Sequence, residues 1–183
     1  EMGYRLGIDT LDQYATAFGL GQSTGIELGE ETGILAGPEH SAEVNQIWYG
    51  GNTVQAAIGQ SDHLFTPLQL ANYIATLVRG GTRYDAHFLK TVTAYDGSAI
   101  LYEHEPEVLS QVEISASTLS AGKEGMYNLT SSGSLARYFK DCVVSAGAKT
   151  GTAQINADTT NNGVFVCFAR CTNISSTNSF PVQ

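Results

Sequence analysis

The sequence predicts a single domain in which α-helices pack with antiparallel β-strands. Its 183 residues, 42% of them hydrophobic, are enough for one buried core. A capped helical pattern follows Thr66, and two pairs of strand patterns are each joined by a connection of hairpin type. No internal repeat or proline-rich linker divides the chain. We therefore expect one ordered unit over residues 1–169 and a weakly ordered, polar tail over residues 170–183.

The first helical pattern follows Asp9, which we expect to be the N-cap. Apolar residues then share one face as far as Phe18, and Gly19 supplies a left-handed stop. The next residues, 18–40, alternate short apolar runs with glycines. This alternation predicts extended segments and tight turns.

Two further helices have clear start signals. Thr66 is the expected N-cap of the first, Pro67 occupies its first helical position, and apolar residues recur at helical spacing until Gly80. The second is expected over residues 116–129, with Ser115 as its N-cap. We expect both helices to bury an apolar face.

The strand patterns come in two pairs. Residues 87–94 and 100–102 flank the turn signal Tyr95-Asp96-Gly97-Ser98. Residues 142–145, continuing through 149–154, are joined to residues 164–169 by a loop rich in Asp, Thr, Asn and Gly. A short connection of this kind favours antiparallel pairing in both cases.

Charge and motif content exclude several functions. Eighteen acidic against nine basic residues give a formal net charge of −9, which would repel polyphosphates, so we expect no nucleic-acid partner. The glycines of residues 19–25 follow a helix with the wrong spacing for a phosphate-binding loop. No apolar run approaches the roughly 20 residues of a membrane span. The sequence indicates no cofactor.

The cysteines and histidines do not form a recognisable metal motif. Three cysteines, Cys142, Cys167 and Cys171, are an odd number without C-x-x-C spacing, and buried thiols are the favoured interpretation. The four histidines have no metal-ligand spacing, which favours surface or half-buried imidazoles. We therefore expect no metal site.

One segment carries candidate chemistry: the residues from Lys149 to Gln154, K-T-G-T-A-Q. Gly151 lets a ligand approach the backbone closely, and Lys149 places a cation beside it. On a strand, Lys149 and Gly151 share one face, whereas Thr150 and Thr152 share the other. Taken alone, the tripeptide favours an ordinary edge strand that carries a solvated lysine.

K-T-G-T-A-Q resembles the third signature of penicillin-binding protein transpeptidases, and other segments match that family in the same order. Residues 4–33 resemble the stretch that follows the second signature, S-x-N, in class B enzymes. The matching segments further along are W-Y-G-G-N-T from Trp48, A-I-G-Q from Ala57 and T-P-L-Q-L-A from Thr66. The resemblance implies an α/β (α+β) fold of the β-lactamase/transpeptidase type, with an antiparallel sheet packed with helices. Here that sheet would lack its outer N- and C-terminal strands.

The resemblance also implies site roles. Lys149 would support proton transfer around a serine nucleophile and help to anchor the substrate. The hydroxyls of Thr150 and Thr152 would hold the carboxylate of a peptide or antibiotic, beside Gly151. The backbone N–H of Thr152 would form half of the oxyanion hole.

The nucleophile itself is not expected in this chain. In the family it belongs to an S-x-x-K motif upstream of S-x-N, hence before Glu1. Ser120-Ala-Gly-Lys123 fits the pattern by chance. It follows the helix expected after Thr66, which is the wrong order for the nucleophile, and it carries a glycine that disfavours a helix turn. Ser176-Thr-Asn178 fits S-x-N but comes after K-T-G. We interpret both as coincidental.

The resemblance therefore predicts the C-terminal part of a class B transpeptidase domain, inactive alone. The whole enzyme would be membrane-anchored, act outside the cytoplasm and cross-link peptidoglycan stem peptides through a serine acyl-enzyme that β-lactam antibiotics trap. Its expected partners are stem peptides, β-lactams, the N-terminal part of the same domain and other cell-wall synthesis proteins. Two alternatives remain: a serine β-lactamase-like hydrolase or antibiotic sensor, and a non-catalytic interaction module on the same fold.

Overall fold

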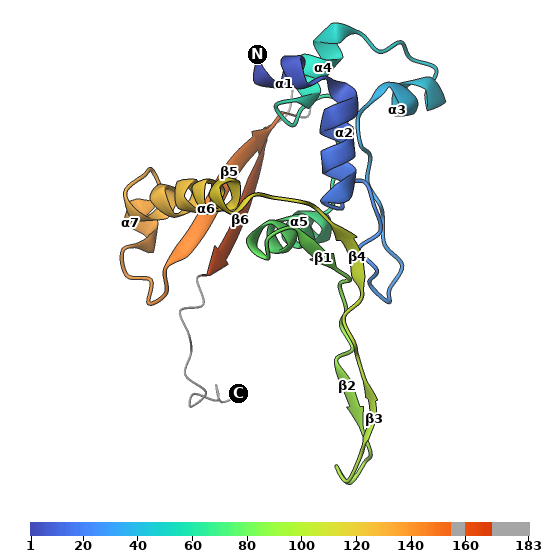
Figure 1. Ribbon diagram of the computed structural model, residues 1–183, viewed down its shortest axis with the longest axis vertical. Coiled ribbons are helices and arrows are strands. Elements are labelled where there is room, and N and C mark those ends of the chain that lie inside the picture. The colour runs from blue at the N-terminus through green and yellow to red at the C-terminus, as the bar shows by residue number, and fades with distance from the viewer. Residues whose placement is uncertain (155–159, 170–183) are drawn as a thin grey trace.

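The computed structural model describes residues 1–154 and 160–169 (Figure 1). The expected tail over residues 170–183 and most of the loop before β6 lie outside the described residues. The described elements, in chain order, are α1 (Met2–Leu6), α2 (Ile8–Ala17), α3 (Pro38–Glu43), α4 (Gly50–Ala56), α5 (Pro67–Val78), β1 (Thr82–Tyr84), β2 (Thr91–Thr93), β3 (Ile100–Glu103), β4 (Val108–Gln111), α6 (Ala116–Ser131), α7 (Ala136–Phe139), β5 (Ala146–Ala153) and β6 (Asn162–Ala169).

The strands form three antiparallel pairs: β1 with β4, β2 with β3, and β5 with β6. Helix α6 packs on β5, and α5 packs on both β6 and β1. In Figure 1 the short helices α1, α3 and α4 gather near one end of the β5–β6 pair, whereas the β2–β3 hairpin projects away from the rest. The mixture of helices and antiparallel strands expected from the sequence is confirmed.

Helix α5 begins with a reciprocal capping box. The Thr66 hydroxyl accepts a hydrogen bond from the Gln69 backbone N–H at 3.1 Å, and the Gln69 Oε1 accepts one from the Thr66 N–H at 3.0 Å. These contacts satisfy backbone donors that a helix start leaves unpaired. The expected cap at Thr66 and the expected position of Pro67 are both confirmed.

The same glutamine also holds a distant loop. Gln69 is 1% exposed, and its Nε2 donates to the carbonyls of Gln22 at 2.8 Å and Thr32 at 2.7 Å. A buried amide is stable only when its donors and acceptor are paired, and Gln69 pairs all three. The extended segment that precedes α3 is thereby fixed against the start of α5.

The N-terminal helical region corrects one expectation and confirms another. Asp9 is not an N-cap, because Gly7 has a φ of 79°, ends α1 and caps α2 from Ile8 onward. Asp9 instead lies in the first turn, where a carboxylate complements the helix dipole. Gly19 has a φ of 89° and closes α2, as expected.

Two strands, β2 and β5, begin later in the chain than predicted. Strand β2 is limited to Thr91–Thr93, because the Glu27 carboxylate takes the N–H groups of Phe88 and Leu89 that a longer strand would use. Strand β5 begins at Ala146, so the strand predicted over residues 142–145 is wrong. Those residues reverse the chain after α7. The turn at residues 95–98 and the cap at Ser115 are confirmed.

The prediction of buried thiols is also wrong where it can be examined. Cys142 and Cys167 are both exposed free cysteines, and Cys171 lies outside the described residues. Cys142 occupies the chain reversal before β5, and Cys167 lines an open groove beside β6. Among the helices of residues 1–154, none is long and apolar enough to cross a membrane.

Replacing Gln69 with alanine should strongly destabilise the fold. The Gln69→Ala variant leaves the Thr66 N–H and the carbonyls of Gln22 and Thr32 without their partner. We expect a loss of about 2–3 kcal/mol in the free energy of unfolding, measured by urea denaturation. Gln13→Ala, at an exposed position in α2, should cost less than about 0.5 kcal/mol. Equal effects of the two substitutions would contradict the anchoring role of Gln69.

His63 should make stability depend on pH. Burial holds the pKa of its imidazole below the ordinary value of 6.5, and its Nδ1 accepts the Ala36 N–H at 3.0 Å. Because the unfolded chain binds the proton more readily, this stabilisation is complete above about pH 6.5 and is lost as pH falls through the lower folded pKa. His63→Asn keeps an acceptor and removes the titration. Melting temperatures from pH 7.5 to 5 should fall more steeply for the wild type than for this variant, and parallel curves would contradict the assignment.

Candidate functional site

The candidate site is built on the β5–β6 ladder. Its eight residue pairs run without a bulge from Ala146 opposite Ala169 to Ala153 opposite Asn162. Within it, Lys149 pairs with Val166 and Thr152 pairs with Gly163. A regular register fixes both the face on which each side chain lies and the edge toward which each backbone N–H points.

Three carbonyl groups of β5 accept hydrogen bonds from side chains outside β6, which shows that these carbonyls point away from β6. The Ala146 carbonyl accepts from the Thr130 hydroxyl of α6 at 2.5 Å, the Thr150 carbonyl from the Lys149 Nζ, and the Thr152 carbonyl from the Gln60 Nε2 at 3.5 Å. In an antiparallel ladder the N–H and C=O of one residue point to the same edge. The N–H groups of Thr150 and Thr152 therefore face the edge of β5 opposite β6.

The side chains of K-T-G divide between the two faces of the strand. Lys149 and Gly151 share the face of Gly147, at which α6 packs, whereas Thr150 and Thr152 lie on the other face. A side chain at Gly147 would come within 2.6 Å of the Phe168 ring. At Gly151 a Cβ would meet only Val164 at 3.7 Å, an ordinary contact. A side chain at 147 would therefore require the Phe168 ring to move, whereas one at 151 would fit at an ordinary contact distance.

Burial changes abruptly along β5. Ala146, Gly147 and Ala148 are buried, whereas the four residues Lys149 to Thr152 are exposed. The strand is thus anchored at its first half and presents the K-T-G-T segment at its second half. Among the described residues, no carboxylate lies within 4.0 Å of the Lys149 Nζ, so this cation is available to an external anion.

Gln60 is a site neighbour that sequence reasoning missed. Besides its bond to Thr152, it lines a hollow of about 430 Å³ at the end of β5 together with Thr152, Gln55 and Asn161. In the sequence, A-I-G-Q is recognisable only as a family match, and its Gln60 lies 92 residues before Thr152 along the chain. No local pattern reveals a contact of that range. The structure therefore brings A-I-G-Q and K-T-G-T together.

The coincidental S-x-x-K motif lies elsewhere. Ser120 and Lys123 are on α6 and line a hollow of about 600 Å³ with Phe168. This hollow shares no residue with the one that Thr152 lines. The glycine at 122 is accommodated within the helix, contrary to the reasoning from helix propensity. The structure does not bring this serine into a common hollow with Thr152.

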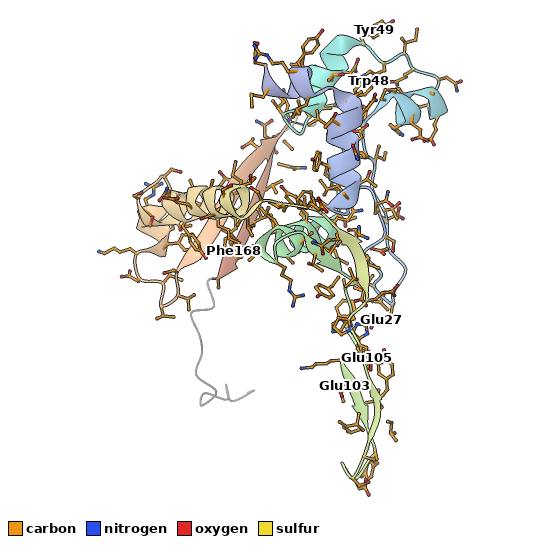
Figure 2. The ribbon with its side chains drawn as sticks, in the orientation of Figure 1. Glu27, Trp48, Tyr49, Glu103, Glu105 and Phe168 are labelled. Carbon is orange, nitrogen blue, oxygen red and sulfur yellow. The ribbon has the colours of Figure 1, made fainter. Side chains whose placement is uncertain are left out.

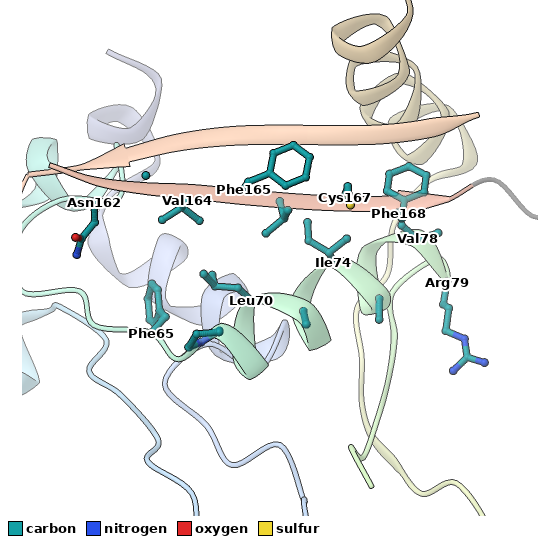
Figure 3. Close-up of a pocket in the computed structure, with 15 residues that line it drawn as sticks. Phe65, Leu70, Ile74, Val78, Arg79, Asn162, Val164, Phe165, Cys167 and Phe168 are labelled. Atoms are coloured by element: carbon teal, nitrogen blue, oxygen red, sulfur yellow. The ribbon is translucent and has the colours of Figure 1, made fainter. Parts of the chain in front are cut away.

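A further groove lies away from the K-T-G segment. It has a volume of about 810 Å³ and lies between α5 and β6, where Figure 3 shows Leu70 and Ile74 of the helix facing the side of the strand on which Val164 lies. Its lining is mainly apolar and includes none of the four predicted site residues. We place the candidate chemistry at the exposed half of β5, because cation, hydroxyls and outward N–H groups converge only there among the described elements.

The alternation along β5 can be measured directly. The amides of Lys149 and Gly151 should exchange with solvent at least about tenfold more slowly than those of Thr150 and Thr152, since only the former bond to β6. Residue-resolved hydrogen exchange by NMR provides the measurement. Equal protection of all four amides would show that the outer edge of β5 is covered.

Comparison with known proteins agrees with this architecture. Residues 1–175 match the penicillin binding protein transpeptidase domain. The chain is 32% identical over 164 residues to the peptidoglycan D,D-transpeptidase MrdA of Escherichia coli K12, covering 85% of this chain and 25% of that protein. It thus spans about a quarter of the length of the curated relatives that it matches first.

Two solved structures share the fold. The Pseudomonas aeruginosa PBP2 complex with WCK 5153 superposes with a TM-score of 0.74 at 26% identity, covering 91% of this chain and 37% of that one. PBP2 of Helicobacter pylori, in its complex with MreC, gives a TM-score of 0.71 at 26% identity over 91% of this chain and 30% of that one. The fold is therefore of the β-lactamase/transpeptidase type, and the chain belongs to the class B penicillin-binding protein transpeptidase family.

Proposed function

We propose that this chain forms the K-T-G wall of a peptidoglycan D,D-transpeptidase site, with the serine nucleophile on a part of the domain outside these 183 residues. The observation that carries the proposal is the outward direction of the Thr152 N–H, on an exposed strand beside a lysine that has no carboxylate partner among the described residues. Membership of the transpeptidase family supports the reaction class.

The reaction begins with attack of the serine Oγ on the carbonyl carbon before the terminal D-alanine of a stem peptide. Negative charge develops on the carbonyl oxygen, and the Thr152 N–H donates to it at the open edge of β5. Preorganised donors of this kind are worth about 2.7–4 kcal/mol of transition-state stabilisation each. Collapse of the intermediate breaks the C–N bond and releases D-alanine, which leaves the acyl-enzyme. The amine of a second stem peptide then attacks this ester and frees the serine.

Lys149 and the two threonines hold the substrate and move protons. The Lys149 ammonium attracts the terminal carboxylate of the stem peptide, and the hydroxyls of Thr150 and Thr152 donate hydrogen bonds to it. Lys149 also supports proton transfer around the serine. No carboxylate among the described residues is in ion-pair contact with Lys149 and competes for these roles. Gly151 leaves room for the peptide to approach the strand.

The wider setting follows from the same proposal. The whole protein would act at the extracytoplasmic face of a bacterial membrane, bind stem peptides and β-lactams, and work beside other cell-wall synthesis proteins. The Helicobacter pylori PBP2, which is similar to this chain, was solved in complex with MreC. A partner of that kind is compatible with the present chain.

Mass spectrometry of the intact chain tests the proposal. The chain is incubated with excess penicillin alone, and then after mixing with the upstream part of a class B transpeptidase domain that carries S-x-x-K and S-x-N. We expect no adduct on the chain alone and an adduct on the upstream serine in the mixture. An adduct at Ser120 of this chain would overturn the assignment.

Two substitutions at Thr152 test its polar groups, of which the backbone N–H is the oxyanion donor. Thr152→Pro removes the outward N–H without removing a bond to β6. It should slow acylation in the mixture by about 10²–10³-fold. Thr152→Ser, the matched control, keeps both the N–H and a hydroxyl and should stay within about threefold of the wild type. Equal acylation rates for the proline and serine variants would remove Thr152 from the oxyanion hole.

A further inference from the structure

Three potential metal ligands meet at the base of the β2–β3 hairpin. Asp85 and His87 follow β1, and His104 follows β3. One ligand atom from each of these residues, the hairpin-base cluster, lies within 4.8 Å of the other two. Asp85 and His104 are partly buried, whereas His87 is the more exposed of the three. They belong neither to the K-T-G segment nor to the hollow that Thr152 lines.

The three side chains of the cluster are in close contact. His104 Nε2 is 2.9 Å from Asp85 Oδ2, and the rings of His87 and His104 stack with centroids 3.8 Å apart. The side chains of Asp85 and His104 are only 9% and 13% exposed. One imidazole and one carboxylate are thus held together with little access to solvent, and a second imidazole stacks against the first.

The close approach of Asp85 to His104 is not a satisfactory hydrogen bond. Although the two atoms lie within ion-pair distance, the buried His104 Nε2 has no hydrogen-bond partner, because the oxygen lies off the direction of an Nε2–H. A buried polar atom without a partner is costly. Ligand atoms bound to one ion at about 2.0–2.2 Å lie about 2.8–3.5 Å apart, so 2.9 Å suits two ligands of one cation.

Hydrogen bonds to the Glu107 backbone hold Asp85 in position. Its Oδ1 accepts the Glu107 N–H at 2.8 Å, and its own N–H donates to the Glu107 carbonyl at 3.0 Å. The Tyr102 hydroxyl lies 3.4 Å from the His104 Nδ1, which leaves Nε2 as the nitrogen that faces Asp85. Backbone and hydroxyl partners of this type orient the ligands of metal sites.

The surroundings are negatively charged. Figure 2 shows Glu27, Glu103 and Glu105 along the same stretch at the base of the hairpin. The Glu27 carboxylate bonds the Phe88 N–H at 3.0 Å, and this contact is the main cause that holds its pKa below the ordinary value. Carboxylates at the base of the hairpin attract a cation.

We propose that Asp85, His87 and His104 bind a divalent transition-metal ion of the Zn²⁺ type, with one coordination position left to water. Two imidazoles and a carboxylate suit zinc and its neighbours, whereas calcium and magnesium prefer oxygen ligands alone. Binding draws His87 inward, since 4.8 Å exceeds the separation of ligands on one ion. The ion joins the two chain segments that lead into and out of the β2–β3 hairpin, and so fixes the hairpin to β1 and β4.

Calorimetric titration of the full 183-residue chain with Zn²⁺, after removal of metal by a chelator, tests the site. We expect one saturable Zn²⁺ per chain. His87→Ala, His104→Ala and Asp85→Asn should each weaken binding by at least about 100-fold, because even outer partners of metal ligands contribute 10–100-fold. His40→Ala is the matched control, since His40 pairs with Glu43 in α3, and it should change the affinity less than about twofold.

A second measurement uses the wild type alone, so its result does not depend on whether the variants fold. On addition of Zn²⁺, the imidazole ¹⁵N resonances of His87 and His104 should move together, whereas those of His40 and His63 should stay in place. Absence of saturable binding would overturn the proposal. Binding that survives all three substitutions, or that moves His40 or His63 instead, would do the same.

Discussion

The register of the β5–β6 ladder is the constraint on which the candidate site depends. Because eight pairs run without a bulge, the parity of each residue decides its face and its edge. The backbone N–H and C=O groups of Lys149 and Gly151 bond to β6, so those of Thr150 and Thr152 face the open edge of β5. A one-residue slip would turn the Thr152 N–H into the sheet and move Lys149 to the opposite face. Packing of α6 over Gly147, together with the Thr130 bond to Ala146, holds the strand in this register.

A second set of contacts brings the distant A-I-G-Q segment to the end of that strand. Gln69 ties the start of α5 to the preceding loop, and the bridge between Ile34 and Leu64 continues the attachment toward Gln60. His63 adds a bond to the Ala36 N–H. Since each of these groups is paired within the protein, the segment leading to Gln60 is held in place without help from a ligand. The hollow at Thr152 is therefore organised by residues remote from K-T-G in sequence.

Local sequence signals correctly predicted the caps of α5 and α6 and the hairpin turn, which depend on residues close together in the chain. Thr66 with Pro67, Ser115 and Gly97 carry their own conformational preferences, and the structure uses them as expected. The K-T-G strand and its family were also recognisable from sequence. The misplaced elements depend on tertiary contacts: the loss of strand over residues 87–90 requires the Glu27 carboxylate. The Gln60 contact and the hairpin-base cluster join residues far apart in the chain, which no spacing rule connects.

The most direct test of the central claim, that Thr152 presents an oxyanion donor at the open edge of β5, is a crystal structure of the penicillin-acylated assembly of this chain with the serine-bearing part of the domain. The account predicts the acyl carbonyl oxygen at about 2.7–3.1 Å from the Thr152 backbone nitrogen, with the antibiotic carboxylate at the hydroxyls of Thr150 and Thr152. An acyl carbonyl turned away from β5, with the Thr152 N–H bonded to another strand, would contradict it.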